Sequence, residues 1–336
     1  MKDKDKVNII IPAIKLDEEL MKCLKELNKL TYLNFFVTVA LDYKPKNKIP
    51  KLKYKVNKLV VGKINMSKKR NIAAKKFNSK YIAFIDSDAY PNKNWLKLAI
   101  KYLKKKKGEV VGGPGIPFNN QNYSEKICYF SKRSKFVTGY LNFRKYKATK
   151  RYCDWLESCN LIMGKKFFLK YGGMDSARYT GEDKEFFERV RKKNPKLKVF
   201  YSPDLFIYHR ERRFIGFLLQ RSCFGMDFIN LIKFNVGLKG LQPVLPVFIF
   251  IILFIIMFSN IATNLKLIIL SSSFALGSGV IFLEIRKYIK SFKDIVLTII
   301  TIGLANLSFA AGSLIALIGL KKMLANKFYS YSRWNK

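Results

Sequence analysis

The sequence YIAFIDSD at residues 81–88 places five apolar residues directly before two aspartates that are one residue apart. A short apolar run that ends in acids predicts a buried strand of a central sheet whose carboxyl end opens into a site. In open α/β sheets, ligands bind just outside the carboxyl ends of the strands. Two carboxylates there can coordinate a hard divalent cation that carries substrate phosphates. Asp86 and Asp88 are therefore candidate metal ligands, although a solvated turn with two acids would have the same short sequence.

Strand-like and helix-like segments alternate around this stretch, as a mostly parallel sheet flanked by helices requires. Residues 7–11 and 35–41 are apolar enough for buried strands, and the second run ends at Asp42. Residues 17–30 carry leucines with the spacing of one helix face. Ser67 is predicted to cap the next helix. The predicted fold class is α/β, with helices on both sides of the sheet.

The chain is strongly basic, with 64 Lys and Arg against 23 Asp and Glu in 336 residues. Such a balance suggests nucleic-acid binding. However, the lysines are spread along the chain and no nucleic-acid recognition motif accompanies them, so we expect no nucleic-acid partner. A basic surface beside membrane spans is drawn to anionic lipids, which we predict as the partner instead. The five scattered cysteines form no Cys-x-x-Cys pair, which is typical of a reduced domain without a zinc site.

The composition changes after residue 213. Residues 214–234 place most apolar side chains on one arc of a helical wheel, which predicts an interfacial helix. Arg221 lies inside the apolar arc, where it either extends to the head groups or faces a bound anion. Three apolar runs of membrane length follow. The predicted organisation is a catalytic domain at 1–213, an interfacial region at 214–242, a transmembrane region at 243–320 with spans at 244–262, 267–283 and 295–320, and a basic tail at 321–336.

Basic residues predict the orientation of these spans. Residues 284–294 contain four Lys and Arg residues, which places this loop in the cytoplasm by the positive-inside rule. The N-terminal domain, two spans earlier, is then cytoplasmic as well, and the protein is a multi-pass protein of the cell membrane. Three simple spans would put the basic tail at 321–336 outside. Either residues 295–320 form a re-entrant hairpin or the tail violates the rule, and we favour the simple span.

Further polar motifs follow downstream. Residues 172–175 read Gly-Gly-Met-Asp, which predicts a turn, and Glu182 and Asp183 precede a helix. Acids at a helix start are common as caps and as compensation for the helix dipole. His209 is the only histidine, so it cannot be half of a His/His zinc site; it follows a strand-like segment and precedes Arg210.

The order of these motifs resembles that of the family 2 glycosyltransferases, which have a GT-A catalytic fold. The resemblance is greatest to membrane-anchored members that build exopolysaccharide or lipid-linked glycans. It covers roughly residues 5–235 and rests on six motifs: Ile-Ile-Ile-Pro at 9–12, Arg70-Asn71, Asp-x-Asp at 86–88, Gly-Gly-Met-Asp at 172–175, Gly-Glu-Asp at 181–183, and Tyr208-His209 followed by Gln220-Arg221. The sequence departs from the family in two places. Residues 40–43 read Ala-Leu-Asp-Tyr where Asp-Asp-Gly-Ser is familiar, and a full Gln-x-x-Arg-Trp signature is missing, which argues against a processive polymerase.

The resemblance implies a nucleotide-diphosphate sugar as donor and Mn²⁺ or Mg²⁺ as cofactor, which would neutralise the charge on the departing diphosphate. It implies metal ligation by Asp88 with Asp86 and His209. Asp183 would be the general base, supported by Glu182.

The resemblance also assigns substrate contacts. Donor contacts are implied for Asp42, Arg70 and Asp86. Diphosphate contacts are implied for Arg210 and Arg221. The acceptor side would be lined by Trp155, Met174 and Asp175.

Three functions remain open from the sequence. The first is a metal-dependent inverting glycosyltransferase that transfers sugar to a hydroxyl of a lipid-linked glycan at the cytoplasmic face. The second transfers to polyprenyl phosphate, as dolichyl-phosphate-sugar synthases do, and would not need Asp183 because an ionised phosphate is already nucleophilic. The third is a membrane-tethered polyanion-binding protein, whose affinity would depend strongly on salt.

Overall fold

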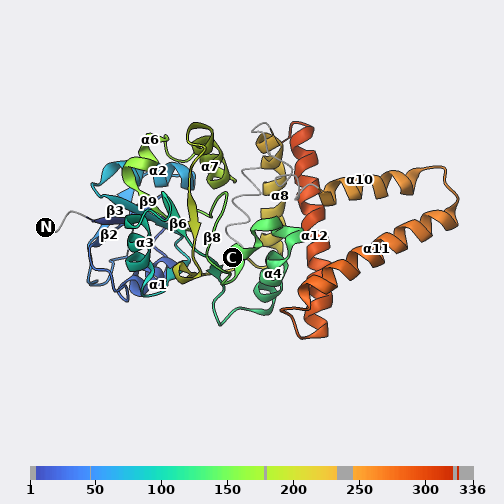
Figure 1. The fold of residues 1–336 in the computed structure, drawn as a ribbon, viewed down its shortest axis with the longest axis horizontal. Coiled ribbons are helices and arrows are strands. Elements are labelled where there is room, and N and C mark those ends of the chain that lie inside the picture. The colour runs from blue at the N-terminus through green and yellow to red at the C-terminus, as the bar shows by residue number, and fades with distance from the viewer. Residues whose placement is uncertain (1–4, 46, 178–179, 233–244, 321–323, 325–336) are drawn as a thin grey trace. The chain divides into compact units, whose positions relative to one another are not determined.

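The computed structural model describes residues 5–45, 47–177, 180–232, 245–320 and 324. The chain divides into two compact units (Figure 1). The first, hereafter the sheet unit, comprises residues 1–118 and 143–210. The second, hereafter the helical unit, comprises residues 119–142 and 211–336. Residues 119–142 therefore belong with the C-terminal helices, although they lie within the stretch predicted as one catalytic domain.

The sheet unit is built on an eight-stranded sheet with strand order β3-β2-β1-β4-β9-β6-β10-β8. Neighbouring strands from β3 to β4 are parallel, whereas β9 runs antiparallel to both β4 and β6. The central strands are entirely buried, as their apolar sequences predict. The prediction of a mostly parallel α/β sheet is confirmed. The strands are β1 Val7–Pro12, β2 Phe35–Leu41, β3 Val56–Val60, β4 Tyr81–Ile85, β6 Val110–Gly112, β8 Arg151–Tyr152, β9 Asn160–Gly164 and β10 Val199–Tyr201.

A second sheet of three strands has the order β5-β11-β7. It consists of β5 Ala89–Pro91, β11 Ile207–His209 and β7 Gly115–Ile116. Strand β11 is antiparallel to β5, and His209 pairs with Ala89. This register places the histidine beside the end of β4, although the two segments are far apart in the sequence.

Helices cover the larger sheet. They are α1 Glu18–Leu27, α2 Met66–Lys76, α3 Trp95–Lys104, α6 Lys165–Lys170 and α7 Glu182–Lys193, with 3₁₀ turns at 139–145 and 203–205. The predicted cap of α2 is wrong: Asn65 caps the helix by accepting a hydrogen bond from the Lys68 amide, and Ser67 lies buried in the first turn. Asn and Ser cap about equally well, so composition alone could not distinguish them.

The helical unit contains α4 Tyr123–Arg133, α5 Lys135–Thr138, α8 Phe214–Ile232, α10 Leu245–Phe258, α11 Thr263–Ile285 and α12 Phe292–Leu317. Within the described residues, α11 and α12 are long and apolar enough to cross a membrane. Helix α10 has 14 residues. The predicted tail at 321–336 lies outside the described residues except for Leu324. The membrane role of these helices remains a prediction.

Polar contacts hold residues 119–142 to the other helices of this unit. The Tyr123 hydroxyl and the Lys126 ammonium both donate to Asp294 at the start of α12, at 2.8 and 2.7 Å. The Ser134 hydroxyl donates to Glu284 near the end of α11, at 2.6 Å. These contacts explain why the segment groups with helices that lie much later in the sequence.

Candidate active site

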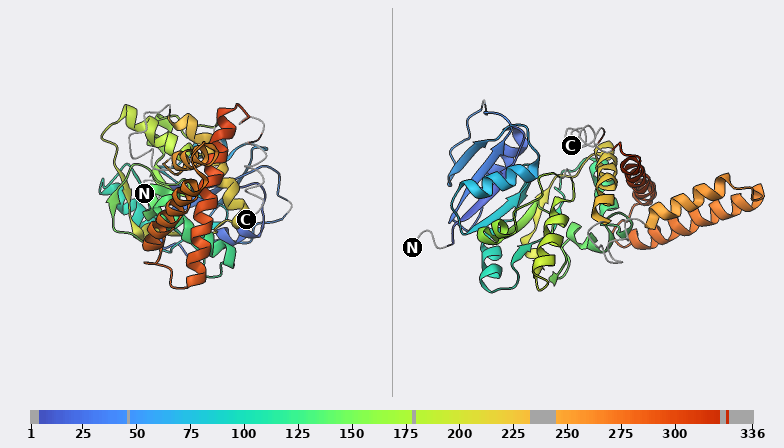
Figure 2. Two further views of the ribbon diagram at one scale, coloured as in Figure 1. Left: turned by 90° about the vertical axis from the view of Figure 1, so that its right-hand side faces the viewer. Right: turned by 90° about the horizontal axis from the view of Figure 1, so that it is seen from above.

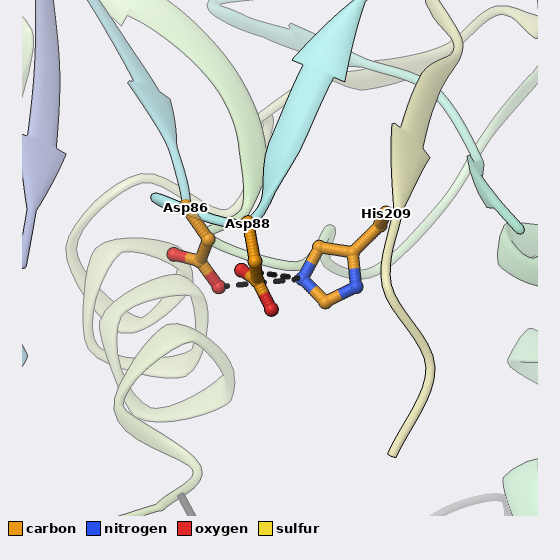
Figure 3. Close-up of side chains that lie close together, drawn as sticks. All are labelled: Asp86, Asp88 and His209. Atoms are coloured by element: carbon orange, nitrogen blue, oxygen red, sulfur yellow. Dashed lines mark ion pairs between the residues drawn. The ribbon is translucent and has the colours of Figure 1, made fainter. Parts of the chain in front are cut away.

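Three predicted metal ligands come together at the carboxyl end of β4. Asp86 and Asp88 follow that strand, and His209 ends β11 (Figure 3). One ligand atom from each of the three residues lies within 4.8 Å of the other two. His209 Nε2 is 3.6 Å from an Asp86 oxygen and 3.7 Å from an Asp88 oxygen. These separations exceed a hydrogen bond, and two carboxylates with one imidazole form a donor set that fits Mn²⁺ or Mg²⁺.

Arg70 connects this cluster to a second pair of acids. Its side chain is buried on α2. One guanidinium nitrogen donates to Asp86 at 2.7 Å, and another contacts Glu182 at 3.4 Å. A rigid guanidinium can serve two carboxylates at once because its donors form a planar fork. The Arg-Asn motif therefore places a cation between the metal-ligand candidates and the start of α7.

The second pair of acids, Glu182 and Asp183, opens helix α7 after Gly181, whose φ of 70° suits glycine. One Asp183 carboxylate oxygen accepts the Ser158 amide at 3.1 Å, and the other accepts the Lys184 amide at 3.0 Å. Burial raises the pKa of Asp183, while the Ser158 hydrogen bond opposes this shift. Burial and, secondarily, the neighbouring Asp183 raise the pKa of Glu182 to about 7. A carboxylate oriented by hydrogen bonds, with a raised pKa, has the properties of a general base.

The raised pKa of Glu182 makes the stability of the fold depend on pH. An acid whose pKa is higher in the folded state binds more protons there, so folding stability falls as pH rises from about 4.5 to about 7. Glutamine mimics the protonated acid. The melting temperature of Glu182→Gln minus that of the original protein should therefore be larger at pH 8 than at pH 5. A difference that stays constant between these pH values would contradict the raised pKa.

Asp42 lies at the end of β2 and forms an ion pair with Lys69, whose side chain is fully buried. The Lys69 ammonium also donates to the Ala13 carbonyl after β1. Sequence reasoning found Asp42 but missed Lys69. The spacing of Lys69 from the buried Met66 and Ala73 on the same helix face was the available signal.

Two arginines were predicted to contact the diphosphate, and the structure places them in different units. Arg210 follows β11 in the sheet unit and pairs with Glu19 of α1. Its amide also donates to the Asp88 carbonyl at 3.3 Å. Arg221 lies in α8 of the helical unit, buried, with its guanidinium carbon 5.0 Å from the ring centre of Phe309. The diphosphate contact at Arg221 stays a prediction.

The residues predicted for the acceptor side lie in two loops. Trp155 is partly exposed, and the buried guanidinium of Arg144 stacks 3.8 Å from its ring centre. Met174 is buried, and the Asn71 side chain exchanges two hydrogen bonds with the Met174 backbone, at 2.7 and 2.9 Å. Asp175 turns back to accept the Ala177 amide at 2.9 Å.

The Asn71 contact was not anticipated from the sequence. It ties the Gly-Gly-Met-Asp turn to the helix that carries Arg70. A Cβ at Gly173 would lie 2.5 Å from the Asn71 side-chain oxygen, and the φ of 73° there is also one that glycine adopts most readily. The second half of the Arg-Asn motif therefore has a structural role that connects two motifs of the site.

Comparisons with known proteins show what this chain is similar to. Residues 8–166 match the model of glycosyl transferase family 2. The chain is similar to glycosyltransferase GlyA of Streptococcus pneumoniae, with 22% identity over 132 residues, which is 38% of this chain and 18% of that protein. It is also similar to S. aureus TarS 1-349 in complex with UDP-GlcNAc, with 15% identity, coverage of 94% of this chain and 92% of that chain, and a TM-score of 0.48. A longer S. aureus TarS structure gives 13% identity, coverage of 92% and 55%, and a TM-score of 0.45. Residues 8–166, somewhat less than half of the chain, are therefore similar to a glycosyl transferase family 2 domain, and the chain spans less than a fifth of the length of the curated glycosyltransferase that it matches.

Proposed function

We propose that the protein is a metal-dependent inverting enzyme that transfers a sugar from a nucleotide diphosphate to an acceptor hydroxyl. The observation that supports this most is the convergence of Asp86, Asp88 and His209 at one end of the central sheet. A divalent cation bound by these residues would neutralise charge on the departing diphosphate. Asp42, Arg70 and Asp86 are the proposed donor contacts of the sheet unit.

The second part of the proposal concerns the acceptor. Asp183 takes the proton from the attacking hydroxyl while that oxygen approaches the sugar from the side opposite the leaving group, which inverts the anomeric carbon. The backbone amides of Ser158 and Lys184 orient the carboxylate for this step. Glu182, whose carboxylate contacts Arg70, supports Asp183 from the neighbouring position. Arg210 is the proposed diphosphate contact of the sheet unit, and Trp155, Met174 and Asp175 lie on the proposed acceptor side.

We further propose that the acceptor is a lipid-linked glycan, presented at the cytoplasmic face of the cell membrane. The support is the exposed apolar surface of α10 and α11, which includes Phe254, Phe258, Leu267 and Phe274. Such a continuous apolar surface is typical of contact with lipid. The chain's positive charge favours anionic lipids as the surrounding partner.

The donor half of this proposal can be tested by thermal unfolding of the full-length protein with nucleoside diphosphates. We expect one nucleoside diphosphate with Mn²⁺ to raise the melting temperature by about 3–5 °C at 100 times its dissociation constant. EDTA should abolish the shift, because the diphosphate is held through the cation. Stabilisation of equal size by every polyanion, with or without Mn²⁺, would instead identify a polyanion-binding protein.

A further inference from the structure

Helix α12 differs from α11 because one of its faces is buried and the other is exposed. Half of its most apolar window is buried, against 6% for α11. The buried face mixes the polar residues Asp294, Thr298, Thr301, Asn306 and Ser313 with apolar residues that include Ile295, Ile302 and Phe309. The exposed face is an apolar stripe of Phe292, Val296, Ile300, Leu304, Leu307, Leu314 and Leu317. Helix α12 therefore exposes one apolar stripe and buries its other face, which includes polar side chains, whereas α11 exposes apolar side chains around most of its surface.

Helix α8 lies directly along the buried face of α12. The Ser222 hydroxyl donates to the Ser308 carbonyl at 2.9 Å, and the Ser313 hydroxyl donates to the Gly225 carbonyl at 3.3 Å. A Cβ at Gly225 would lie 2.0 Å from the Phe309 carbonyl oxygen. A Cβ at Gly312 would likewise lie 2.0 Å from the Ser222 carbonyl oxygen. The two backbones are thus in contact, so the depth of one helix in a membrane fixes the depth of the other.

Helix α8 is poorly suited to the interior of a bilayer. Its sequence contains Gln220, Arg221, Asp227 and Asn230, and Arg221 and Asp227 are buried in this helical unit. A single charged residue at the centre of a spanning helix costs about 2.5–3.5 kcal/mol. If α12 crossed the membrane, α8 would have to enter the hydrocarbon beside it. An orientation in the plane of the interface avoids this cost and still buries the apolar stripe of α12.

Positive charge at both ends of α12 supports the same orientation. Arg286, Lys287, Lys290 and Lys293 precede or open the helix and are exposed. The sequence after the helix continues with Lys321 and Lys322. A spanning helix would place one of these groups on the outer side, against the positive-inside rule. A helix lying in the interface places both at the anionic head groups of one leaflet.

The α10–α11 hairpin, in contrast to the α8–α12 pair, has features suited to crossing the bilayer. It projects away from the α8–α12 pair in two views (Figures 1 and 2). Its connecting segment, residues 259–262, includes Asn260, and the first turn of α11 adds Asn264 and Lys266; these three side chains are suited to water. Helix α11 has 23 residues and is about 34 Å long at 1.5 Å per residue, enough to cross a hydrocarbon core of about 30 Å.

We propose that α12 lies with α8 in the membrane interface, with its apolar stripe toward the acyl chains and its basic ends at anionic head groups. The α10–α11 hairpin then crosses the bilayer, with the 19-residue apolar sequence at 244–262, which includes α10, as its first span. The C-terminal tail lies on the same side as residues 286–291. This topology replaces the simple span over 295–320 favoured from the sequence and removes its conflict with the basic tail. It does not depend on the proposed catalytic activity.

Cysteine labelling of the full-length protein in sealed membrane vesicles of both orientations tests this topology. Lys287→Cys reports the loop before α12, Ser259→Cys the hairpin tip, and Ser332→Cys the tail. A membrane-impermeant maleimide is added before or after detergent, and the unsubstituted protein gives the background of the five free cysteines.

We expect Lys287→Cys and Ser332→Cys to react from the same side, and Ser259→Cys from the opposite side. Reaction of Ser332→Cys from the side of Ser259→Cys would overturn the proposal, because α12 would then cross the membrane. Reaction of all three from one side would also overturn it, because the hairpin would not cross.

Discussion

Replacing Asp183 with asparagine should lower the rate of sugar transfer to a hydroxyl acceptor by about 100- to 10,000-fold, the usual contribution of a general base. Asparagine preserves the size of the side chain and its one carbonyl oxygen can still accept the Ser158 amide, while the Lys184 amide loses its acceptor; the loop of Ser158 should therefore keep its position. The carboxylate that would take the acceptor proton is absent. The measurement is the turnover rate with saturating donor, alongside the affinity for the donor, which should change little.

The matched control is Glu188→Gln, which removes a partly exposed acid from the same helix and should leave the rate unchanged. Nearly full activity of Asp183→Asn would contradict the hydroxyl mechanism. A phosphate-acceptor enzyme would give a different result. Asp183→Asn would still transfer sugar to polyprenyl phosphate, because an ionised phosphate needs no base, and neither this variant nor the original protein would transfer sugar to a hydroxyl acceptor.

Replacing Arg70 with methionine should destabilise the fold by about 3–5 kcal/mol, as expected when one partner of a buried ion pair is removed. Arg70 contacts both Asp86 and Glu182, so its loss leaves two acids without their shared cation. We expect activity to fall as well, since Asp86 would no longer be held beside Asp88. Chemical denaturation with the linear extrapolation gives the change in unfolding free energy.

Two variants separate the role of the guanidinium from that of charge alone. Lys68→Met removes an exposed cation from the same helix and should change the unfolding free energy by less than about 0.5 kcal/mol. Arg70→Lys keeps the charge but cannot serve two carboxylates with a planar fork, so we expect it to recover only part of the loss. Equal stability of Arg70→Met and Lys68→Met would contradict the bridging role.

The sequence predicts the part of the fold that is determined locally. The apolar runs at 7–11, 35–41 and 81–85 became β1, β2 and β4 because buried parallel strands need continuous apolar residues. The position of the two acids at the end of β4 was also predictable, because they directly follow its apolar run in the sequence. Helix boundaries were predicted less accurately: Glu182 and Asp183 were expected to precede the helix, but α7 begins at Glu182, so both acids lie inside its first turn.

The rest depends on contacts between distant segments, which no local pattern encodes. His209 reaches the acids only because β11 pairs with β5, a strand too short to predict. Nothing in the local sequence distinguishes Lys69 from the many other lysines; its pairing with Asp42 follows from the packing of α2. Residues 119–142 join the helical unit through Asp294 and Glu284, which follow them by more than a hundred residues.

Direct measurement of Mn²⁺ binding tests the central claim that Asp86, Asp88 and His209 form a metal site. The loss of the free-Mn²⁺ signal in electron paramagnetic resonance gives the affinity without reference to activity. Asp88→Asn should weaken binding at least about tenfold, because a carboxylate ligand loses its charge. Asp5→Asn, at the opposite end of the sheet before β1, should bind as the original protein does. Equal Mn²⁺ affinity in Asp88→Asn and the original protein would contradict the metal site.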